Sequence, residues 1–286
     1  MQSAQATANT MNDFLKTVIA ERKEDVRKAS QQVPFSVLQR EVATNASRRS
    51  LTDRLHQGAK TGETRIIAEV KKASPSVGLI LDPYDPAPVV REYEKAGACA
   101  ISVLTEPRYF LGNPDDLRAV RRAVKLPVLR KDFLCDPYQI YESAAMNADV
   151  ILLIVAALDF MLLRDLYIIA LAIGLEVIVE VHSLDELEMV LPLAKVIIGV
   201  NNRDLATLQT HLDTSREMAA YIPPDRLCIS ESGIRTREEI EELQSLGYKG
   251  FLVGESLLTS DHPALQLWTL LGYQPQHWPK RRPLIT

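Results

Sequence analysis

Cysteine is scarce in this sequence, with three cysteines among 286 residues and no CxxC pair. Cys99, Cys135 and Cys228 lie far apart and are odd in number, which indicates isolated buried thiols of a reducing compartment. The five histidines show no spacing typical of metal ligands. The sequence therefore predicts neither a disulfide scaffold nor a metal site.

Long apolar runs and a strong charge imbalance are also missing. Residues 150–163 are mostly apolar, but Asp159 interrupts them, and they are fewer than the ~18 residues that span a bilayer. The formal net charge is −4, from 33 basic and 37 acidic residues, so we expect no nucleic acid or membrane partner. Residues 1–10 lack the basic and apolar regions of a secretory signal. We expect a cytoplasmic protein, with a plastid location left open.

From Ile66 onward, short apolar or β-branched runs alternate with charged segments of helical periodicity, such as PAPVVREYEKAGA and TREEIEELQSLG. Each step is about the length of one strand–helix unit. Eight such units predict a single α/β domain, a closed (β/α)8 (TIM) barrel. An open doubly wound sheet is the alternative, but the GxGxxG turn of a dinucleotide-binding sheet is missing after the first run. The runs begin near Ile66, Ala98, Leu126, Asp149, Leu175, Val196, Leu227 and Gly250.

We assign residues 64–273 to the barrel and residues 11–63 to an N-terminal helical extension packed on it. Met11, Phe14, Leu15, Val18 and Ile19 form one apolar stripe of a first helix, and a second helix is expected around residues 50–59. This extension either caps the bottom of the barrel or covers its active face. Residues 1–10 are expected to be a disordered leader, and residues 274–286 an irregular tail.

Polar side chains interrupt the apolar pattern near the carboxyl ends of five predicted strands, where such barrels place their active sites. Residues two apart share one face of a strand, so these side chains point inward together. A rim salt bridge would explain one of them, whereas five strands converging on one mouth indicate acid–base chemistry. No serine or cysteine has the pattern of an activated nucleophile. The inward set is Glu69, Lys71, Lys131, Glu180, Asn201 and Glu231.

The loops after the seventh and eighth predicted strands have the composition of a phosphate site. They contain Ser232-Gly233 and Gly254-Glu255, and glycine lets backbone N–H groups approach a ligand closely. Barrels of this type often hold a phosphate at these two loops. Ser74, in the turn after the first strand, could add a hydroxyl group.

Several segments resemble the motifs of the indole-3-glycerol phosphate synthase family. They are IIAEVKKASPSVGLI, ISVLTEPRYFLGN, PVLRKDF, IGVNNRDL, SESGI and VGESL, in this order over roughly residues 60–260. KDF and NNRDL are the most specific of them. The resemblance implies that 1-(2-carboxyphenylamino)-1-deoxyribulose 5-phosphate is converted to indole-3-glycerol phosphate, CO2 and water, without a cofactor.

The resemblance also implies roles for the residues. Lys131 would be the general acid that protonates the ketone, while Glu180 and Glu69 would handle the cation and the protons of dehydration. The other implied catalytic residues are Lys71, Asn201, which would orient a substrate hydroxyl, and Glu231, which would complete the mouth together with Ser232. The implied substrate contacts are Ser74, Gly233, Gly254 and the amide of Glu255 for the phosphate, Phe110 and Phe133 for the anthranilate ring, and Arg203 as a brace between loops.

Two other functions are alternatives for this sequence, and one position departs from the family pattern. Phosphoribosylanthranilate isomerase needs a cysteine at the end of the first strand, where this chain has Glu69-Val70-Lys71. A catalytically silent binding barrel should have lost some of the inward charges, yet all are present. Val77 stands where many family members carry a lysine. We expect a monomer or weak homo-oligomer, and association with another tryptophan-pathway enzyme stays open.

Overall fold

The computed structural model describes residues 2–44, 47–204 and 207–278. Eight parallel strands close into a barrel, in the order β1-β10-β9-β8-β7-β6-β5-β4, so the predicted (β/α)8 barrel is confirmed. Each strand lies in one of the eight predicted runs. The strands are β1 (Ile66–Val70), β4 (Ala100–Leu104), β5 (Val128–Lys131), β6 (Val150–Ile154), β7 (Glu176–Val181), β8 (Val196–Asn201), β9 (Cys228–Glu231) and β10 (Gly250–Val253).

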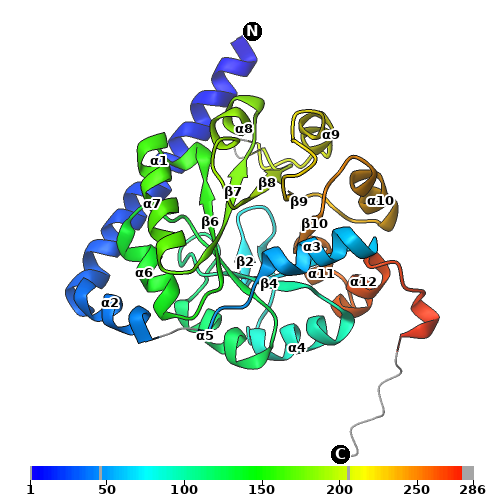
Figure 1. The fold of residues 1–286 in the computed structure, drawn as a ribbon, viewed down its shortest axis with the longest axis horizontal. Helices are drawn as coiled ribbons and strands as arrows, with labels where there is room; N and C mark the ends of the chain where they lie inside the picture. The colour runs from blue at the N-terminus through cyan, green and yellow to red at the C-terminus, as the bar shows by residue number, and fades with distance from the viewer. Residues whose placement is uncertain (1, 45–46, 205–206, 279–286) are drawn as a thin grey trace, which may run out of the picture.

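Helices surround the barrel (Figure 1). Several of them begin where the sequence carries a proline behind an Asp or Asn cap, and Pro114 behind Asn113 is one case. The helices after the strands are α4 (Pro86–Ala96), α5 (Pro114–Ala123), α6 (Pro137–Ala145), α7 (Phe160–Ala172), α8 (Leu184–Val190), α9 (Asp213–Ala219), α10 (Arg237–Ser245), α11 (Glu255–Leu258) and α12 (Pro263–Leu270). No helix in these described ranges is long and apolar enough to cross a membrane.

Small elements complete the connections. A hairpin of β2 (Ala73–Ser74) and β3 (Gly78–Leu79) follows β1, and the 3-10 helix η1 (Val155–Ala157) follows β6. The tail after Tyr273 contains the 3-10 helix η2 (Pro275–His277), and the rest of the predicted irregular tail, from residue 279, lies outside the described residues.

Two apolar layers hold the barrel together. The outer layer lies between strands and helices and includes Val70, Val90 and Leu117. The inner layer fills the barrel, where Ile67, Leu129 and other inward side chains of the strands pack together. The inner layer gives way to charged groups at the carboxyl ends of the strands, and this is where the site forms.

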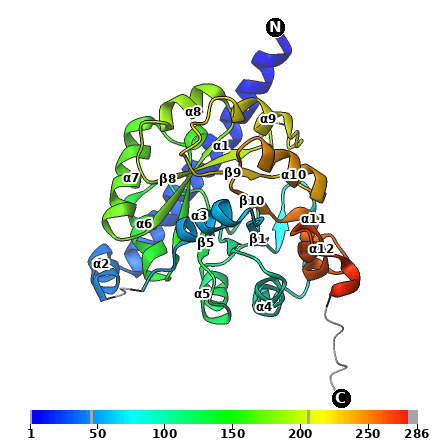
Figure 2. The same ribbon diagram turned by 45° about the vertical axis from the view of Figure 1, so that its right-hand side comes forward.

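The N-terminal extension consists of α1 (Gln2–Gln32), α2 (Phe35–Thr44) and α3 (Leu51–Thr61). α3 covers one end of the barrel and α1 passes behind the opposite end (Figures 1 and 2). The two interpretations considered for the extension, a bottom cap and a cover on the active face, thus belong to two different helices.

At the amino ends of the strands, α3 is fastened by Glu176, the first residue of β7. Its carboxylate accepts hydrogen bonds from the N–H groups of Leu51 (2.8 Å) and Thr52 (3.0 Å) and from the Ser50 hydroxyl (2.6 Å). Leu51 and Leu55 are fully buried in the inner layer. α3 therefore closes the bottom of the barrel.

At the carboxyl ends, α1 buries Leu15 and Val18 in the same inner layer, together with Phe133 and Ile154. The structure begins α1 at Gln2, where the sequence predicted a disordered leader over residues 1–10 and a helix from Met11. Alanine and glutamine favour helix, and neither glycine nor proline breaks the pattern there.

If α3 is the bottom cap, truncating its core residue should destabilise the fold without changing the site. Leu55→Ala removes a fully buried side chain and should lower the free energy of unfolding by about 2–5 kcal/mol. Leu246→Ala is the matched control, because Leu246 is 41% exposed and should cost less than about 0.5 kcal/mol. Urea denaturation monitored by circular dichroism measures both. Equal losses in the two variants would contradict the assignment of α3.

Candidate active site

A cavity of about 500 Å³ opens at the carboxyl ends of the barrel strands. Side chains from β1, β5, β7 and β8 form its floor, and the loops after β4, β8, β9 and β10 form its walls. The predicted site residues that line it are Glu69, Lys71, Phe110, Lys131, Phe133, Glu180, Asn201, Arg203, Ser232, Gly233, Gly254 and Glu255. Twelve of the fourteen predicted site residues therefore lie at this one cavity.

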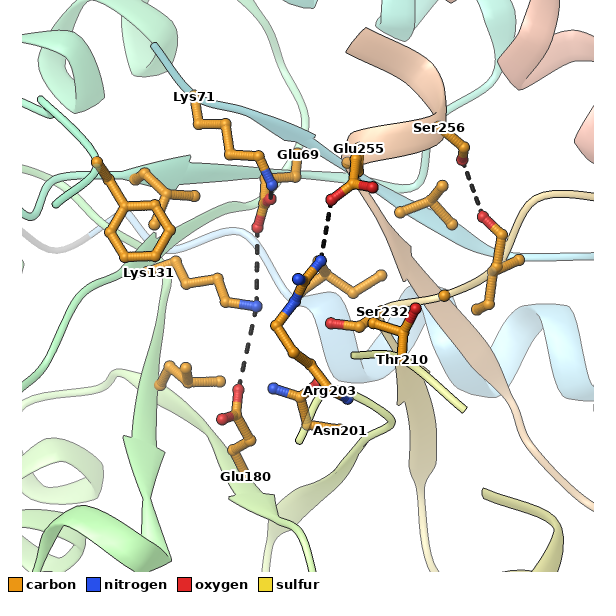
Figure 3. A pocket seen from close by; sticks show the side chains of 18 of the residues that line it. Glu69, Lys71, Lys131, Glu180, Asn201, Arg203, Thr210, Ser232, Glu255 and Ser256 are labelled. Atoms are coloured by element: carbon orange, nitrogen blue, oxygen red, sulfur yellow. Dashed lines mark hydrogen bonds and ion pairs between the residues drawn. The ribbon is translucent and has the colours of Figure 1, made fainter. Parts of the chain in front are cut away.

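The floor is built around the ammonium group of Lys131, the last residue of β5. Its Nζ lies 3.0 Å from Glu231, 3.7 Å from Glu69 and 4.0 Å from Glu180. Figure 3 shows the Nζ of Lys131 between the carboxylates of Glu69 and Glu180. The three carboxylates come from β1, β7 and β9, so only the closed barrel brings them together.

These neighbours decide the charge of Lys131. Burial alone would lower the pKa of the Lys131 ammonium, but Glu231, Glu69 and Glu180 outweigh burial and raise it. The side chain keeps 17% of its surface exposed, at the cavity. Lys131 is therefore a charged group that faces the cavity and has three carboxyl groups on its other sides.

Glu69 is ionised as well, because it has two cationic neighbours. Burial raises its pKa, but Lys71, at 2.7 Å, and then Lys131 outweigh burial and leave the pKa of Glu69 below its ordinary value. Lys71, Glu69 and Lys131 thus form a row of alternating charge across the floor (Figure 3).

Glu180 is paired with His182, a residue that the sequence analysis did not select. Nε2 of His182 lies 3.3 Å from Glu180, and Nδ1 lies 3.5 Å from Glu186 in α8. Burial raises the pKa of Glu180, but His182 outweighs burial and lowers it to about 2. The only signal in the sequence was that His182 lies two residues after Glu180, on the same side of the strand end.

Glu231 is in a different position from the other two carboxyl groups. It is fully buried, and it lies behind Lys131 rather than among the residues that line the cavity. Burial, together with the negative charge of Glu180, outweighs the opposing effect of Lys131 and raises the pKa of Glu231 to about 7. Its Oε1 is buried and has no hydrogen-bond partner, which also disfavours the ionised form. Below about pH 7, Glu231 therefore carries a proton next to Lys131.

Two glycines make room for these carboxyl groups. A Cβ at Gly199 of β8 would lie 2.3 Å from Oε1 of Glu231, and a Cβ at Gly254 would lie 2.4 Å from Oε1 of Glu69. Gly254 was expected to bring its backbone close to a ligand. In the structure, the missing side chain of Gly254 also leaves the space that the Glu69 side chain occupies. Sequence reasoning did not predict this requirement for glycine.

The wall after β9 has an unusual backbone. Ser232 and Gly233 have φ angles of 66° and 81°, in the left-handed region that glycine adopts freely and serine rarely does. Gly254 then precedes α11, whose first residues, Glu255 and Ser256, line the same wall. Two backbone turns thus meet on one side of the cavity, as the predicted phosphate site requires.

The opposite wall is aromatic. Phe110, from the loop after β4, and Phe133, after β5, have ring centroids 6.5 Å apart and planes tilted by 43°. Between the two walls, Arg203 donates to Glu255 (2.9 Å) and to the carbonyl of Leu208 (2.9 Å), and its N–H donates to Asn201 (3.0 Å). Arg203 therefore joins the loop after β8 to the start of α11.

Besides Glu231, Ser74 is the predicted residue that does not line the cavity. It is buried in the hairpin after β1, where its Oγ accepts a hydrogen bond from the N–H of Val77 (3.3 Å). The sequence analysis also missed part of the lining, which includes Glu106, Thr210, Arg235, Ser256 and Gln266. In the described part of the chain, no group of three or more His, Cys, Asp or Glu side chains could hold a metal ion.

The contacts of His182 predict its charge. Burial alone would lower its pKa, but Glu180 and Glu186 raise the pKa of the imidazole to about 10, well above the ordinary value of 6.5. His182 should therefore carry both ring protons at about pH 8, where ordinary histidines have lost one. Nitrogen-15 NMR of the imidazole, assigned with a His182→Asn variant, measures this. A neutral ring at about pH 8 would contradict the pairing.

Sequence comparison supplies independent relatives. The family model for indole-3-glycerol phosphate synthase matches residues 15–270. A protein of that name from Carboxydothermus hydrogenoformans is 43% identical over 263 residues, which are 91% of this chain and 100% of the relative. Another, from Syntrophobacter fumaroxidans, is 44% identical over 262 residues, covering 92% and 98% of the two chains.

Similar solved structures share the fold at low identity. The tryptophan synthase alpha chain from Legionella pneumophila has a TM-score of 0.58 and 14% identity, covering 81% of this chain and 97% of its own. The 3-hexulose-6-phosphate synthase from Salmonella typhimurium has a TM-score of 0.58 and 12% identity, covering 75% and 100%. The length and identity of the sequence matches show that this chain belongs to the indole-3-glycerol phosphate synthase family.

Proposed function

We propose that this chain converts 1-(2-carboxyphenylamino)-1-deoxyribulose 5-phosphate to indole-3-glycerol phosphate, CO2 and water by acid–base catalysis. One observation carries the proposal: the Lys131 ammonium, on the floor of the cavity, lies within 4.0 Å of three carboxyl groups. The walls provide an aromatic pair at one side and two backbone turns at the other, which match the two ends of this substrate.

In the first step, the ring carbon that bears the carboxylate attacks the ketone carbon, and a C–C bond forms. The ketone oxygen takes a proton from Lys131, since a developing alkoxide is a far stronger base than an amine. The aniline nitrogen becomes an iminium, whose positive charge Glu180 and Glu69 stabilise. Both carboxyl groups are held ionised by their neighbours, so they are suited to this role.

In the second step, the C–CO2 bond breaks and its electron pair restores the aromatic ring. Lys71 lies beside Glu69 at the cavity, where it attracts the substrate carboxylate before CO2 leaves. In the third step, one carboxylate takes a proton from the carbon next to nitrogen, and the former ketone oxygen leaves as water after receiving a second proton. Asn201 orients that hydroxyl group.

Lys131 must regain its proton between the first and the third step. Glu231 is placed to supply it, since its Oε2 is 3.0 Å from the Lys131 Nζ and its pKa is raised to about 7, mainly by burial. Glu231 thus acts through Lys131 and needs no contact with the substrate.

For substrate binding, the phosphate is assigned to Ser232, Gly233, Gly254 and the amide of Glu255, at the wall formed by two turns. Arg203 keeps these loops together through Glu255. The anthranilate ring is assigned to Phe110 and Phe133. Ser74 contributes to phosphate binding only by stabilising its hairpin, because its hydroxyl is hydrogen-bonded within the hairpin rather than at the cavity.

A direct assay tests the activity. The purified chain is incubated with the carboxyphenylamino-deoxyribulose phosphate, and indole fluorescence of the product is followed. We expect fluorescence to rise with enzyme concentration and one CO2 to be released per product formed. The absence of product at high enzyme concentration would refute the proposal and leave a binding function.

Lys131 should matter for the chemical step far more than for binding. Lys131→Met removes the proton donor and keeps most of the side-chain volume, so kcat should fall about 100- to 10,000-fold. The Kd of a substrate analogue whose ketone is reduced to an alcohol should change less than about 5-fold. Stopped-flow fluorescence and calorimetry measure the two quantities. A near-normal kcat would refute the assignment of Lys131.

The proposal extends to the setting of the enzyme. We assign it to the cytoplasm, as a monomer or weak homo-oligomer that needs no cofactor. A phosphorylated small molecule is its partner, without nucleic acid or membrane. The net charge of −4 supports the expectation that neither nucleic acid nor a membrane is a partner. Sedimentation equilibrium measures the oligomeric state. A stable oligomer at nanomolar concentration would refute the assignment as a monomer or weak homo-oligomer.

A further inference from the structure

A chain of ion pairs runs from α1 to both sides of the aromatic wall. At its centre lies Asp25, which is 23% exposed. Its carboxylate accepts two hydrogen bonds from Arg108, at 2.5 and 2.6 Å, and one from Arg22, at 2.8 Å. Arg108 belongs to the loop after β4, and Arg22 lies one turn before Asp25 in α1.

The arm through Arg22 ends beside Phe133. Nη2 of Arg22 donates to Asp132 at 2.9 Å, and the Asp132 side chain is fully buried. The same carboxylate accepts hydrogen bonds from Thr105 (2.7 Å) and from the N–H of Phe133 (2.8 Å). Asp132 lies between Lys131 and Phe133 in sequence, so this arm fixes one ring of the aromatic wall to α1.

The arm through Arg108 ends beside Phe110. Glu106 accepts hydrogen bonds from the N–H groups of Arg108 (2.8 Å), Tyr109 (2.6 Å) and Phe110 (3.0 Å), so residues 106–110 form one stiff turn. The contacts of this turn with α1 include the ion pair of Arg108 with Asp25, a longer one of Arg108 with Glu21 (4.0 Å), and an edge-to-face contact of Tyr109 with Phe14, with centroids 5.2 Å apart.

We propose that Asp25 is a positioning residue for the substrate ring, because it joins the Phe110 turn and the Phe133 segment to one helix and so sets the gap between the two rings. The inference rests on the proposed function, in which these rings hold the anthranilate group. Asp25 itself lies outside the cavity lining and touches neither ring, so its effect passes through Arg108 and Arg22.

A purely structural role for Asp25 would give a different result. Loss of packing between α1 and the barrel would lower stability and the fraction of folded enzyme, which reduces kcat and leaves KM unchanged. A misplaced Phe110 turn would instead weaken binding of the ring while Lys131 and its carboxylates stay in place. The division of the effect between KM and kcat therefore separates the two roles.

Asp25→Asn tests the proposal, with Glu24→Gln as the matched control. The two residues are neighbours in α1, but Glu24 faces solvent and pairs with Arg27 at 2.7 Å. Losing charge-assisted hydrogen bonds from Asp25 should raise KM about 5- to 10-fold with kcat within about 2-fold of wild type. Glu24→Gln should change neither constant, and Asp25→Glu should restore most of the affinity.

The Kd of the reduced-ketone analogue, measured by calorimetry, gives a reading that does not need turnover. It should rise by the same factor as KM in Asp25→Asn and in Arg108→Met, whose side chain is 36% exposed in the native protein and so leaves the core intact. The proposal would be overturned if Asp25→Asn had the same KM and the same Kd as Glu24→Gln and wild type. It would also be overturned if Asp25→Asn lowered kcat alone. If wild type binds the analogue but forms no product from the carboxyphenylamino-deoxyribulose phosphate, the proposed reaction fails while the test of Asp25 by Kd stands.

Discussion

The ammonium of Lys131, held among three buried carboxyl groups, is the constraint on which the rest of the site depends. Like charges this close in a low-dielectric interior cannot all be ionised without compensation. The compensating positive charges are distributed unequally. Glu69 is paired with Lys71 and Glu180 with His182, whereas Glu231 shares Lys131 with both of them. Because Glu231 has no cation of its own, it is the carboxyl group that takes up a proton.

This arrangement also dictates features that look unrelated to catalysis. Gly199 and Gly254 have no side chain because Glu231 and Glu69 occupy the space of a Cβ. Glu186 of α8 lies on the far side of His182 and, together with Glu180, keeps the imidazole charged. The charged floor thus constrains β8, α8 and the start of α11, which come from separate parts of the sequence.

The sequence allowed the barrel to be predicted because strands buried on both faces leave a long apolar pattern with a regular period. It also allowed Glu69, Lys131 and Glu180 to be selected, because an inward charge stands out against that pattern. Partners across the barrel could not be predicted in this way. Lys131 of β5 meets Glu180 of β7 and Glu231 of β9 at 3 to 4 Å, and these strands are not neighbours, so only the closed barrel brings the groups together.

The N-terminal extension shows a similar limit. Its apolar stripe predicted that it packs on the barrel, but not at which end. The answer depends on Glu176, which binds the start of α3 at the bottom, and on Asp132, which binds Arg22 of α1 at the top. Both are single residues in strands or loops far from the extension in sequence.

The proton on Glu231 can be measured directly by infrared difference spectroscopy, as the C=O band of a buried carboxylic acid. The wild-type spectrum minus that of Glu231→Gln should show one such band at about pH 6, below the pKa of Glu231. It should disappear as the pH rises through about 7, because burial raises the pKa of Glu231 to that value. A difference spectrum without this band, or a wild-type band that persists in Glu231→Gln, would contradict the placement of the proton beside Lys131.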